Sequence, residues 1–407
     1  SGSRKGAMLA TFGLGVLIFV DDYFNCLTVG NVMRPITDKN RVSRAKLAYV
    51  VDATAAPICM IAPISSWAAA VTGVVEGYNG FELFIRAIPY NLYSLLTMAM
   101  IVIITLMGRD YGPMRKHEEN AIRTGDVYTT PDRPYAGQDG EVAAGKGKVR
   151  DLVIPVLILI VLCVAGMVYT GGILEGASIK DAFANCDASL GLSLGSALAL
   201  IIVIIYFILR KVLTFNECMA CFPEGFKAMV PAILILTFAW TLSGITGLLG
   251  AKEFVSGLFA GSAAGLKMLL PAMVFAVAVG MSFATGTSWG TFGILLPIVV
   301  AVGLEPELLG ISVSACLAGA VCGDHCSPIS DTTIMSSTGA MCNHINHVET
   351  QLPYALTVAA VSFVGYIIAG LVQSAWIVLP LSMAMLFGVL YSIKLSQGKK
   401  AVAPLAQ

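Results

Sequence analysis

The sequence ISVSACLAGAVCGDHCSPISDTTIMSSTG, residues 311–339, begins as an apolar segment that is interrupted by GDHCSPISDTT, residues 323–333. A helix that crosses lipid satisfies its backbone with continuous i to i−4 hydrogen bonds. Pro328 removes one donor and Gly323 loosens the chain, so a broken helix is predicted here. Such a break is tolerated at membrane depth only inside protein or beside a cavity, and ionisable residues there are functional candidates. We therefore expect half of an ion or substrate site in this stretch.

The composition places the whole chain in a membrane. Of its 407 residues, 57% are hydrophobic and only 12% are charged, whereas soluble domains carry about 25% charged residues. The fold class predicted is an all-α polytopic membrane protein. A formal net charge of zero argues against nucleic acid as a partner. The ten cysteines are scattered, and the pair Cys218 and Cys221 has no second pair to complete a zinc site, so we expect reduced cysteines.

The amino-terminal region predicts a re-entrant hairpin. Residues 6–20 are apolar but too short to cross about 30 Å of hydrocarbon, and polar residues 21–25 follow before a second short apolar run. Basic residues flank both ends, which favours a cytoplasmic position for both. The hairpin would have residues 21–25 near its tip, and one long spanning helix is the alternative. Residues 46–75 then predict a broken helix that passes through Asp52, Pro57 and Pro63.

The remaining segments alternate between spans and connections. Residues 81–107 predict a span that leads to a flexible cytoplasmic loop rich in Lys, Arg, Gly and Pro. A second hairpin is predicted around SFATGTSWGT, residues 282–291. The other expected elements are spans at 152–170, 190–209 and 229–249, a surface helix near 216–228, a short outer segment at 251–265, hairpin arms within 268–302, and spans at 350–372 and 375–393.

The two interrupted regions match each other in sequence. Residues 25–36 align without a gap against 287–298, and both segments end in Pro-Ile. The broken helices align in two ways, with Pro328 opposite either Pro63 or Pro57; the second is preferred because it brings Asp52 within one place of Asp324. Charge bias and span parity give the two regions opposite directions, which predicts an inverted-topology repeat. Because the second repeat is preceded by further spans, we also expect helices before Ser1.

Four regions follow from this division. They are a first repeat at 1–107, a cytoplasmic hydrophilic loop at 108–151, a second repeat with scaffold helices at 152–393, and a cytoplasmic tail at 394–407.

The polar residues beside the breaks predict a cation site. Hard cations such as sodium prefer oxygen ligands, and unwound carbonyls can add to carboxylates and hydroxyls. A carboxyl group buried away from water has a raised pKa, so it can exchange a proton for a cation near neutral pH. Asp324 and Asp331 are the expected sodium ligands and cation or proton carriers. The full set of candidate binding residues is Asp324, Asp331, Ser327, Ser330, Thr332, Thr285, Thr287, Ser288, Asp22, Asn25, Ser65 and Ser66.

Other polar and aromatic residues have two interpretations each. Asp52 is either part of the site or a hydrogen-bonding group in helix packing. His325 is a proton-carrier candidate because imidazole titrates near neutrality, and the alternative is a fixed hydrogen-bond partner. His344 and His347 are expected in a solvated connection. The tryptophans next to the matched breaks, Trp67 and Trp289, either wall a pocket or pack together.

Enzyme and channel interpretations are less favoured. The sequence contains no HExxH or GxSxG motif, so no catalytic residues are assigned and no cofactor is expected. Paired hairpins favour alternating access over an open pore.

Three motifs resemble the NhaC family of sodium/proton antiporters: GDHCSPISDTT at 323–333, TGTSWGTFGILLPI at 285–298 and FVDDYFNCLTVGNVMRPITD at 19–38. The resemblance implies a secondary transporter with two inverted repeats, re-entrant hairpins and elevator-like motion in the bacterial inner membrane. Because that family also includes exchangers of malate and lactate, the resemblance indicates the class better than the substrate.

The function predicted is therefore a sodium/proton antiporter. The alternative is a sodium- or proton-coupled transporter or exchanger of an organic acid or amino acid, whose carboxylate would suit the amino ends of half-helices. The expected partners are sodium, protons and the lipid bilayer, with a small organic solute and a homodimer left open.

Overall fold

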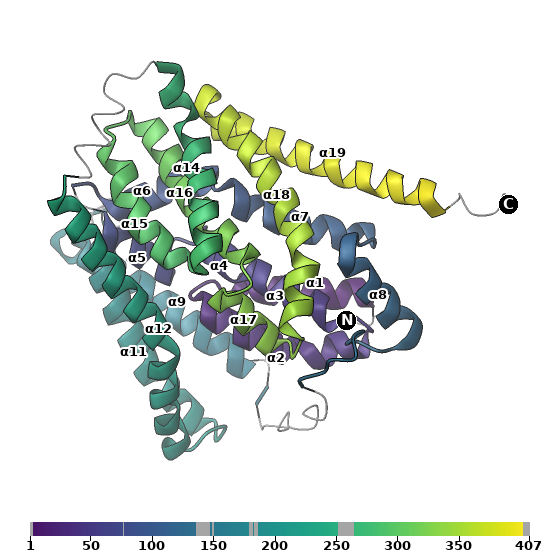
Figure 1. Cartoon of the computed structure of the whole chain (residues 1–407). Helices are drawn as coiled ribbons and strands as arrows, with labels where there is room; N and C mark the ends of the chain where they lie inside the picture. The colour runs from purple at the N-terminus through teal and green to yellow at the C-terminus, as the bar shows by residue number, and fades with distance from the viewer. Residues whose placement is uncertain are drawn as a thin grey trace.

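A computed structural model of the chain describes residues 3–75, 77–135, 147–148, 150–178, 182, 186–250 and 264–401. Over these ranges the regular structure is helical and includes no strand. Figure 1 shows α11 (Ala188–Leu209) and α12 (Phe215–Leu248) along one flank of the molecule, and α19 (Ala375–Ala401) along another. The predicted outer segment at 251–265 falls, up to residue 263, outside the described residues.

The amino-terminal region is a helix pair followed by an interrupted helix. A short turn joins α1 (Arg4–Leu17) to α2 (Asp22–Lys39), and the two helices contact each other. The next helix is divided into α3 (Arg44–Thr54), α4 (Ala56–Cys59) and α5 (Ser66–Val74), so the predicted interruption is confirmed.

The tip of this helix pair lies earlier than predicted. The Asp21 side chain accepts a hydrogen bond of 2.9 Å from Phe24 N and thereby caps α2. Asp22 and Asn25 consequently lie in the first turn of α2 rather than at the tip, because an N-cap side chain stabilises the helix that starts directly after it.

The next two segments differ in detail from their predictions. The span predicted at 81–107 is divided into α6 (Gly80–Ala87), η1 (Ile88–Tyr90) and α7 (Leu92–Met107), with a bend of 44°. Pro89 lies at the bend, where its missing N–H prevents a regular helix. The loop predicted at 108–151 contains α8 (Gly112–Thr124).

Contacts with the helical body hold α8 in place. It buries Met114 and Ala121, and its Glu118 forms an ion pair with Arg4 of α1. A polar composition therefore did not prevent ordering, because one face of α8 buries apolar side chains. Residues 136–146 and 149 of this loop lie outside the described residues.

Among the described residues, the middle of the chain contains three long helices. α9 (Arg150–Thr170) and the short η2 (Ile173–Glu175) precede α11, and α9 and α11 contact each other extensively. α12 runs continuously through the surface helix and the span that were predicted separately at 216–228 and 229–249.

The carboxyl-terminal region repeats the order of elements of the amino-terminal region. Residues Gly286 and Thr287 join α14 (Ala264–Thr285) to α15 (Ser288–Ala301). An interrupted helix follows as α16 (Pro306–Cys326) and α17 (Asp331–Gly339), and α18 (His344–Val372) leads to α19.

Gly323 does not break the helix as predicted, since α16 continues through it. A Cβ atom at this position would lie 2.3 Å from Val279 O of α14. The glycine therefore allows two helices to approach closely, and the interruption is confined to residues 327–330, which include Pro328.

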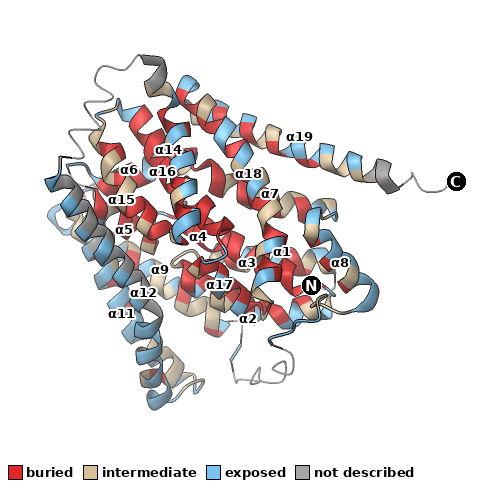
Figure 2. Ribbon diagram, viewed as in Figure 1, coloured by how far each residue is buried: buried red, intermediate tan, exposed pale blue. Residues whose placement is uncertain are grey.

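Six helices are long and apolar enough to cross a membrane, or seven if the bent α6–α7 pair counts as one span, among the residues described. Their burial differs widely: 89% of the apolar window of α16 is buried, against 11% for α11. Figure 2 shows the buried residues concentrated around α16, α3 and α4, with exposed residues along α11 and α19. The interrupted helices therefore form the centre of the protein.

Candidate functional site

In each half of the chain, a hydrogen bond connects the turn of the helix pair to the break in the interrupted helix. In the amino-terminal region, Ser66 N at the start of α5 donates to Val20 O in the α1–α2 turn at 2.8 Å. In the carboxyl-terminal region, Ser327 Oγ donates to Phe283 O near the α14–α15 turn, also at 2.8 Å. Each helix-pair turn is thereby held against the break of the interrupted helix that follows it.

Contacts between the two halves bring together the two helix-pair turns and the breaks of the two interrupted helices. Tyr23 Oη, in the first turn of α2, donates a hydrogen bond of 2.5 Å to Asp331 Oδ2 at the start of α17. The rings of Trp67 on α5 and Trp289 on α15 lie 5.3 Å apart, and both side chains are buried. The two tryptophans therefore pack together, which was the second of their two predicted roles.

Asp324 is a buried carboxylate held by a hydroxyl group of the neighbouring helix pair. It is 2% exposed, and Ser288 Oγ donates a hydrogen bond of 2.6 Å to its Oδ2. Its Oδ1 is buried and has no hydrogen-bond partner among the described residues. Burial of a charged oxygen without a partner is costly, so this atom is suited to bind a cation or a proton.

Asp22, at the start of α2, is a carboxylate of the amino-terminal region. It is fully buried, and its Oδ2 accepts a hydrogen bond of 3.1 Å from Trp67 Nε1. Over the described part of the chain, no Lys or Arg forms an ion pair with Asp22, Asp324 or Asp331. Three carboxylates without basic partners therefore lie near the meeting point of the breaks.

Three of the predicted hydroxyl groups cap the amino ends of helices that begin at the turns and breaks. Ser65 accepts from Ala68 N at 3.3 Å, Ser330 from Thr333 N at 3.2 Å and Thr287 from Gly290 N at 3.3 Å. These bonds are N-caps of α5, α17 and α15. The positive ends of three helix dipoles consequently lie at the breaks.

Asn25 holds the amino-terminal helix pair to the break in the next helix. Its Nδ2 donates to Gly15 O and Ile18 O, both at 2.8 Å, and to Thr54 O at 3.1 Å. This amide therefore satisfies backbone carbonyls that the interruptions leave without helical partners.

Of the predicted threonines, Thr332 lies next to the site residues, whereas Thr285 does not. Thr332 is buried, and its Oγ1 lies 3.1 Å from Ser330 Oγ. Thr285 is exposed and donates within its own helix to Met281 O at 2.9 Å, so its hydroxyl is not brought to the carboxylates.

Two histidines that were expected in a solvated connection instead bond to groups of the interrupted helices. His347 is fully buried, and its Nε2 lies 3.1 Å from Asp52 Oδ2. His344 Nε2 lies 2.7 Å from Pro328 O in the break. The prediction failed because α18 begins at His344 rather than near residue 350, so its first turns lie against the interrupted helices.

A fixed polyvalent metal site is not formed by these groups. Within the described residues, no group of three or more His, Cys, Asp or Glu side chains could hold a metal ion. All ten cysteines are free thiols.

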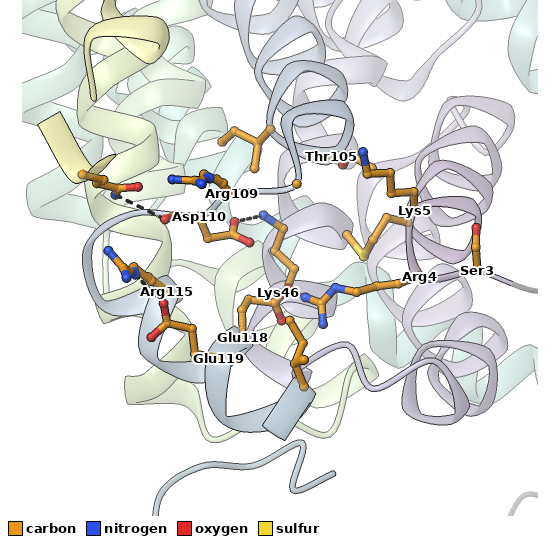
Figure 3. A pocket seen from close by; sticks show the side chains of 15 residues that line it. Ser3, Arg4, Lys5, Lys46, Thr105, Arg109, Asp110, Arg115, Glu118 and Glu119 are labelled. Carbon is orange, nitrogen blue, oxygen red and sulfur yellow. Dashed lines mark hydrogen bonds and ion pairs between the residues drawn. The ribbon is translucent and has the colours of Figure 1, made fainter. Parts of the chain in front are cut away.

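A cavity of about 650 Å³ lies away from the predicted site, between α1, α8 and the end of α7. Figure 3 shows its charged side chains, with Lys46 and Asp110 directed toward each other as an ion pair. None of the predicted binding residues lines this cavity. Its ion pairs, Lys46–Asp110 and Arg4–Glu118, attach α8 and the segment before it to the helical body.

The fold and site together define a multi-pass helical membrane protein with buried carboxylates at interrupted helices. Residues 58–371 match the Na+/H+ antiporter family. The chain belongs to this family, which is a family of transporters, and the resemblance drawn from its motifs is confirmed.

Two of the following three curated relatives are named antiporters. An uncharacterized protein of Haemophilus influenzae is 39% identical over an alignment of 407 positions, which covers 96% of this chain and 76% of the relative. The malate-2H(+)/Na(+)-lactate antiporter of Bacillus subtilis is 37% identical over 22% of this chain and 20% of its own length. An uncharacterized Na(+)/H(+) antiporter of Haemophilus influenzae is 32% identical over 36% of this chain and 31% of its own length. No solved structure matches the chain.

Proposed function

We propose that this protein exchanges sodium for protons across the bacterial inner membrane, and that sodium binds at Asp324 and Asp331. The observation that supports this most directly is Asp324 itself, a buried carboxylate with one oxygen bonded to Ser288 and the other without a partner among the described residues. A sodium ion or a proton can neutralise such a group, whereas the binding of both is disfavoured by their like charges. Competition between them is sufficient to couple their movements.

The surrounding helix ends can complete the coordination of sodium. Regular helical hydrogen bonding is interrupted at residues 327–330, where Ser327 and Ser330 add hydroxyl oxygens next to Asp331. Asp22 is a third carboxylate at the meeting point. In this proposal Asp22 contributes negative charge, and Asp324 and Asp331 contribute ligands.

In this proposal the two regions form an inverted repeat, which would provide alternating access. Both regions contain a helix pair and then an interrupted helix in the same order. The proposal is that the helix pairs and half-helices move together as a unit relative to the peripheral helices, so that the carboxylates face each side of the membrane in turn. The tryptophan contact between the two halves would belong to this moving unit.

The proposed exchange is tested in proteoliposomes whose interior is acidic and which contain no organic solute. Addition of sodium outside is expected to dissipate the proton gradient, and potassium at the same concentration serves as the control. Asp324→Asn and Asp331→Asn are expected to abolish this response, while Asp126→Asn, which changes a carboxylate outside the site, is expected to retain it. Full activity of both site variants would show that the carboxylates are not the carriers.

Exchange of an organic acid is a second candidate because a relative is named a malate-2H(+)/Na(+)-lactate antiporter. A solute carboxylate could lie at the amino ends of α5, α15 and α17, where helix dipoles favour negative charge. Counterflow of labelled malate or lactate in sodium-containing proteoliposomes tests this. The second candidate would be favoured over the first if labelled solute shows counterflow and if sodium drives no proton movement when solute is absent.

A further inference from the structure

The cavity beside α8 is lined by more basic than acidic side chains. Five of its lining residues are basic and three are acidic. Each acidic residue is paired with one of the basic residues, in the ion pairs Arg4–Glu118, Lys46–Asp110 and Arg115–Glu119. Among the described residues, the remaining basic residues of the cavity, Lys5 and Arg109, form no ion pair with an acidic side chain. The wall of the cavity therefore carries two uncompensated positive charges.

These two cations lie at the carboxyl end of α7. Lys5 Nζ of α1 donates a hydrogen bond of 2.6 Å to Leu106 O, and Lys5 Cε lies 3.4 Å from the position of a Cβ atom at Gly108. Arg109 follows that glycine directly and is exposed. Figure 3 shows Lys5 and Arg109 on either side of the ion pair between Lys46 and Asp110. A concave wall concentrates the field of such charges, so the cavity is suited to attract an anion.

The cavity also lies where two candidate membrane spans end. The apolar pair α6–α7 ends at Met107, and the apolar stretch of α19 ends at Gln397, which lines the cavity. Gln397 Nε2 donates a hydrogen bond of 3.3 Å to Asp110 O, so the end of α19 is attached to the segment that follows α7. Apolar spans end at the level of the lipid headgroups. The cavity is therefore at the depth where the phosphate groups of a bilayer lie.

Apolar side chains line the same cavity next to the cations. They are Met8 of α1, Ile104 of α7 and Ile122 of α8. A much smaller pocket shares Ile104 and Arg109 with this cavity and is also lined by Leu390 and Ile393 of α19. The volume of about 650 Å³ lies within the usual range for bound organic molecules, roughly 300–1,000 Å³. A phosphate group with an apolar remainder consequently matches this lining better than a bare anion does.

We infer that this cavity binds an anionic phospholipid, with Lys5 and Arg109 on its phosphate group and the apolar side chains along its glycerol and first acyl carbons. The lipid would contact α1, α7 and α19 together. Since a ligand that binds only the folded state stabilises that state, the lipid should raise the stability of the protein. The site is separate from the carboxylates assigned to sodium and proton exchange, and the inference does not depend on that exchange.

Thermal unfolding of the full chain in a neutral detergent tests the site. Phosphatidylglycerol, phosphatidylcholine and glycerol 3-phosphate are added separately to wild type and to the double variant Lys5→Gln/Arg109→Gln. Phosphatidylglycerol is expected to raise the thermal midpoint of wild type, and this rise is expected to be lost in the double variant. Phosphatidylcholine has no net charge and glycerol 3-phosphate has no acyl chain, so each should raise the midpoint much less.

The matched control removes two exposed charges of α8 that do not line the cavity, in the double variant Lys116→Gln/Arg123→Gln. It is expected to respond to phosphatidylglycerol as wild type does. An equal rise in Lys5→Gln/Arg109→Gln, or an equal response of wild type to both lipids, would overturn the site. A full rise with glycerol 3-phosphate alone would assign the cavity to a soluble phosphate compound and overturn the lipid as its ligand.

A measurement on the unmodified protein covers a double variant that does not fold. A phosphatidylglycerol analogue with a photoreactive headgroup is expected to label peptides that contain residues 3–8 or 104–109. Excess phosphatidylglycerol should suppress this labelling, whereas excess phosphatidylcholine should not. Labelling that is confined to other peptides would contradict the inference.

Discussion

Tyr23 Oη donates a hydrogen bond of 2.5 Å to Asp331 Oδ2, although the two residues are 308 positions apart. The same carboxylate accepts a second bond of 2.7 Å through Oδ1 from Thr332 N at the start of its own helix. The orientation of Asp331 therefore depends on α2 as well as on α17. In this way a residue of the first helix pair controls a carboxylate that belongs to the second half.

Tyr23→Phe removes the hydrogen bond to Asp331 while it retains the ring. A hydrogen bond to a charged group contributes about 1.5–3 kcal/mol, so the sodium concentration for half-maximal proton movement should change by about tenfold or more. Sodium titration in proteoliposomes measures this change. Tyr111→Phe, which loses a hydroxyl bonded to Thr357 outside the site, is expected to behave as wild type. An unchanged titration for Tyr23→Phe would show that this bond does not position the carboxylate during exchange.

Ser288→Ala leaves Asp324 without its hydroxyl donor. We expect sodium-driven proton movement to fall by about tenfold, because a buried carboxylate oxygen then lacks a donor that contributes about 1.5–3 kcal/mol. The matched control is Ser312→Ala, since the one bond of that buried hydroxyl within the described residues goes to Leu308 O in the same helix. Initial rates at one sodium concentration separate the two variants, and equal rates would argue against a role for Ser288.

Gly323→Ala should destabilise the protein. The added Cβ would lie 2.3 Å from Val279 O, and forced separation of packed helices costs about 1–3 kcal/mol. At Gly280 of α14 a Cβ meets no atom within 4 Å, so Gly280→Ala should leave the thermal midpoint unchanged or raise it. Thermal unfolding in detergent measures both variants. A midpoint for Gly323→Ala at or above that of Gly280→Ala would contradict the close helix contact.

His117→Gln should reduce the sensitivity of the fold to acid. Burial lowers the pKa of His117, which lies on α8 outside the candidate spans, and Glu349 partly offsets this. Between the lowered folded value and the usual value of about 6.5, the unfolded chain binds more protons, so stability falls as the pH falls through this window. The thermal midpoint should therefore drop less in His117→Gln than in wild type between about pH 7.5 and about pH 5.5. Equal drops would exclude this histidine as a source of acid sensitivity.

The predicted helix breaks show which structural features local sequence can determine. Pro328 interrupts the chain where predicted because a missing backbone donor acts locally. Gly323 was misassigned because glycine is also used where helices cross closely, and its role depends on a neighbour in another helix. Local pattern does not distinguish these two uses.

The two alternative alignments of the broken helices each match part of the structure. Asp52 and Asp324 both lie two residues before a helix end, which fits the preferred alignment with Pro57 opposite Pro328. Ser65 and Ser330 are both N-caps, which fits the other alignment. The first break spans residues 55–65 and the second only 327–330, so no alignment without a gap could match both sides.

By itself the sequence determined that the chain is helical, that it crosses a membrane and that two of its helices are interrupted near residues 57–63 and at residue 328, because apolar length and proline act over a few residues. It also identified Asp22, Asp324 and Asp331 as ionisable groups beside those interruptions. Only the tertiary structure decided which groups meet. The pairs Tyr23–Asp331 and Asp52–His347 form because helices from both halves cross at one place, and contacts between such distant segments leave no periodic signal in the chain.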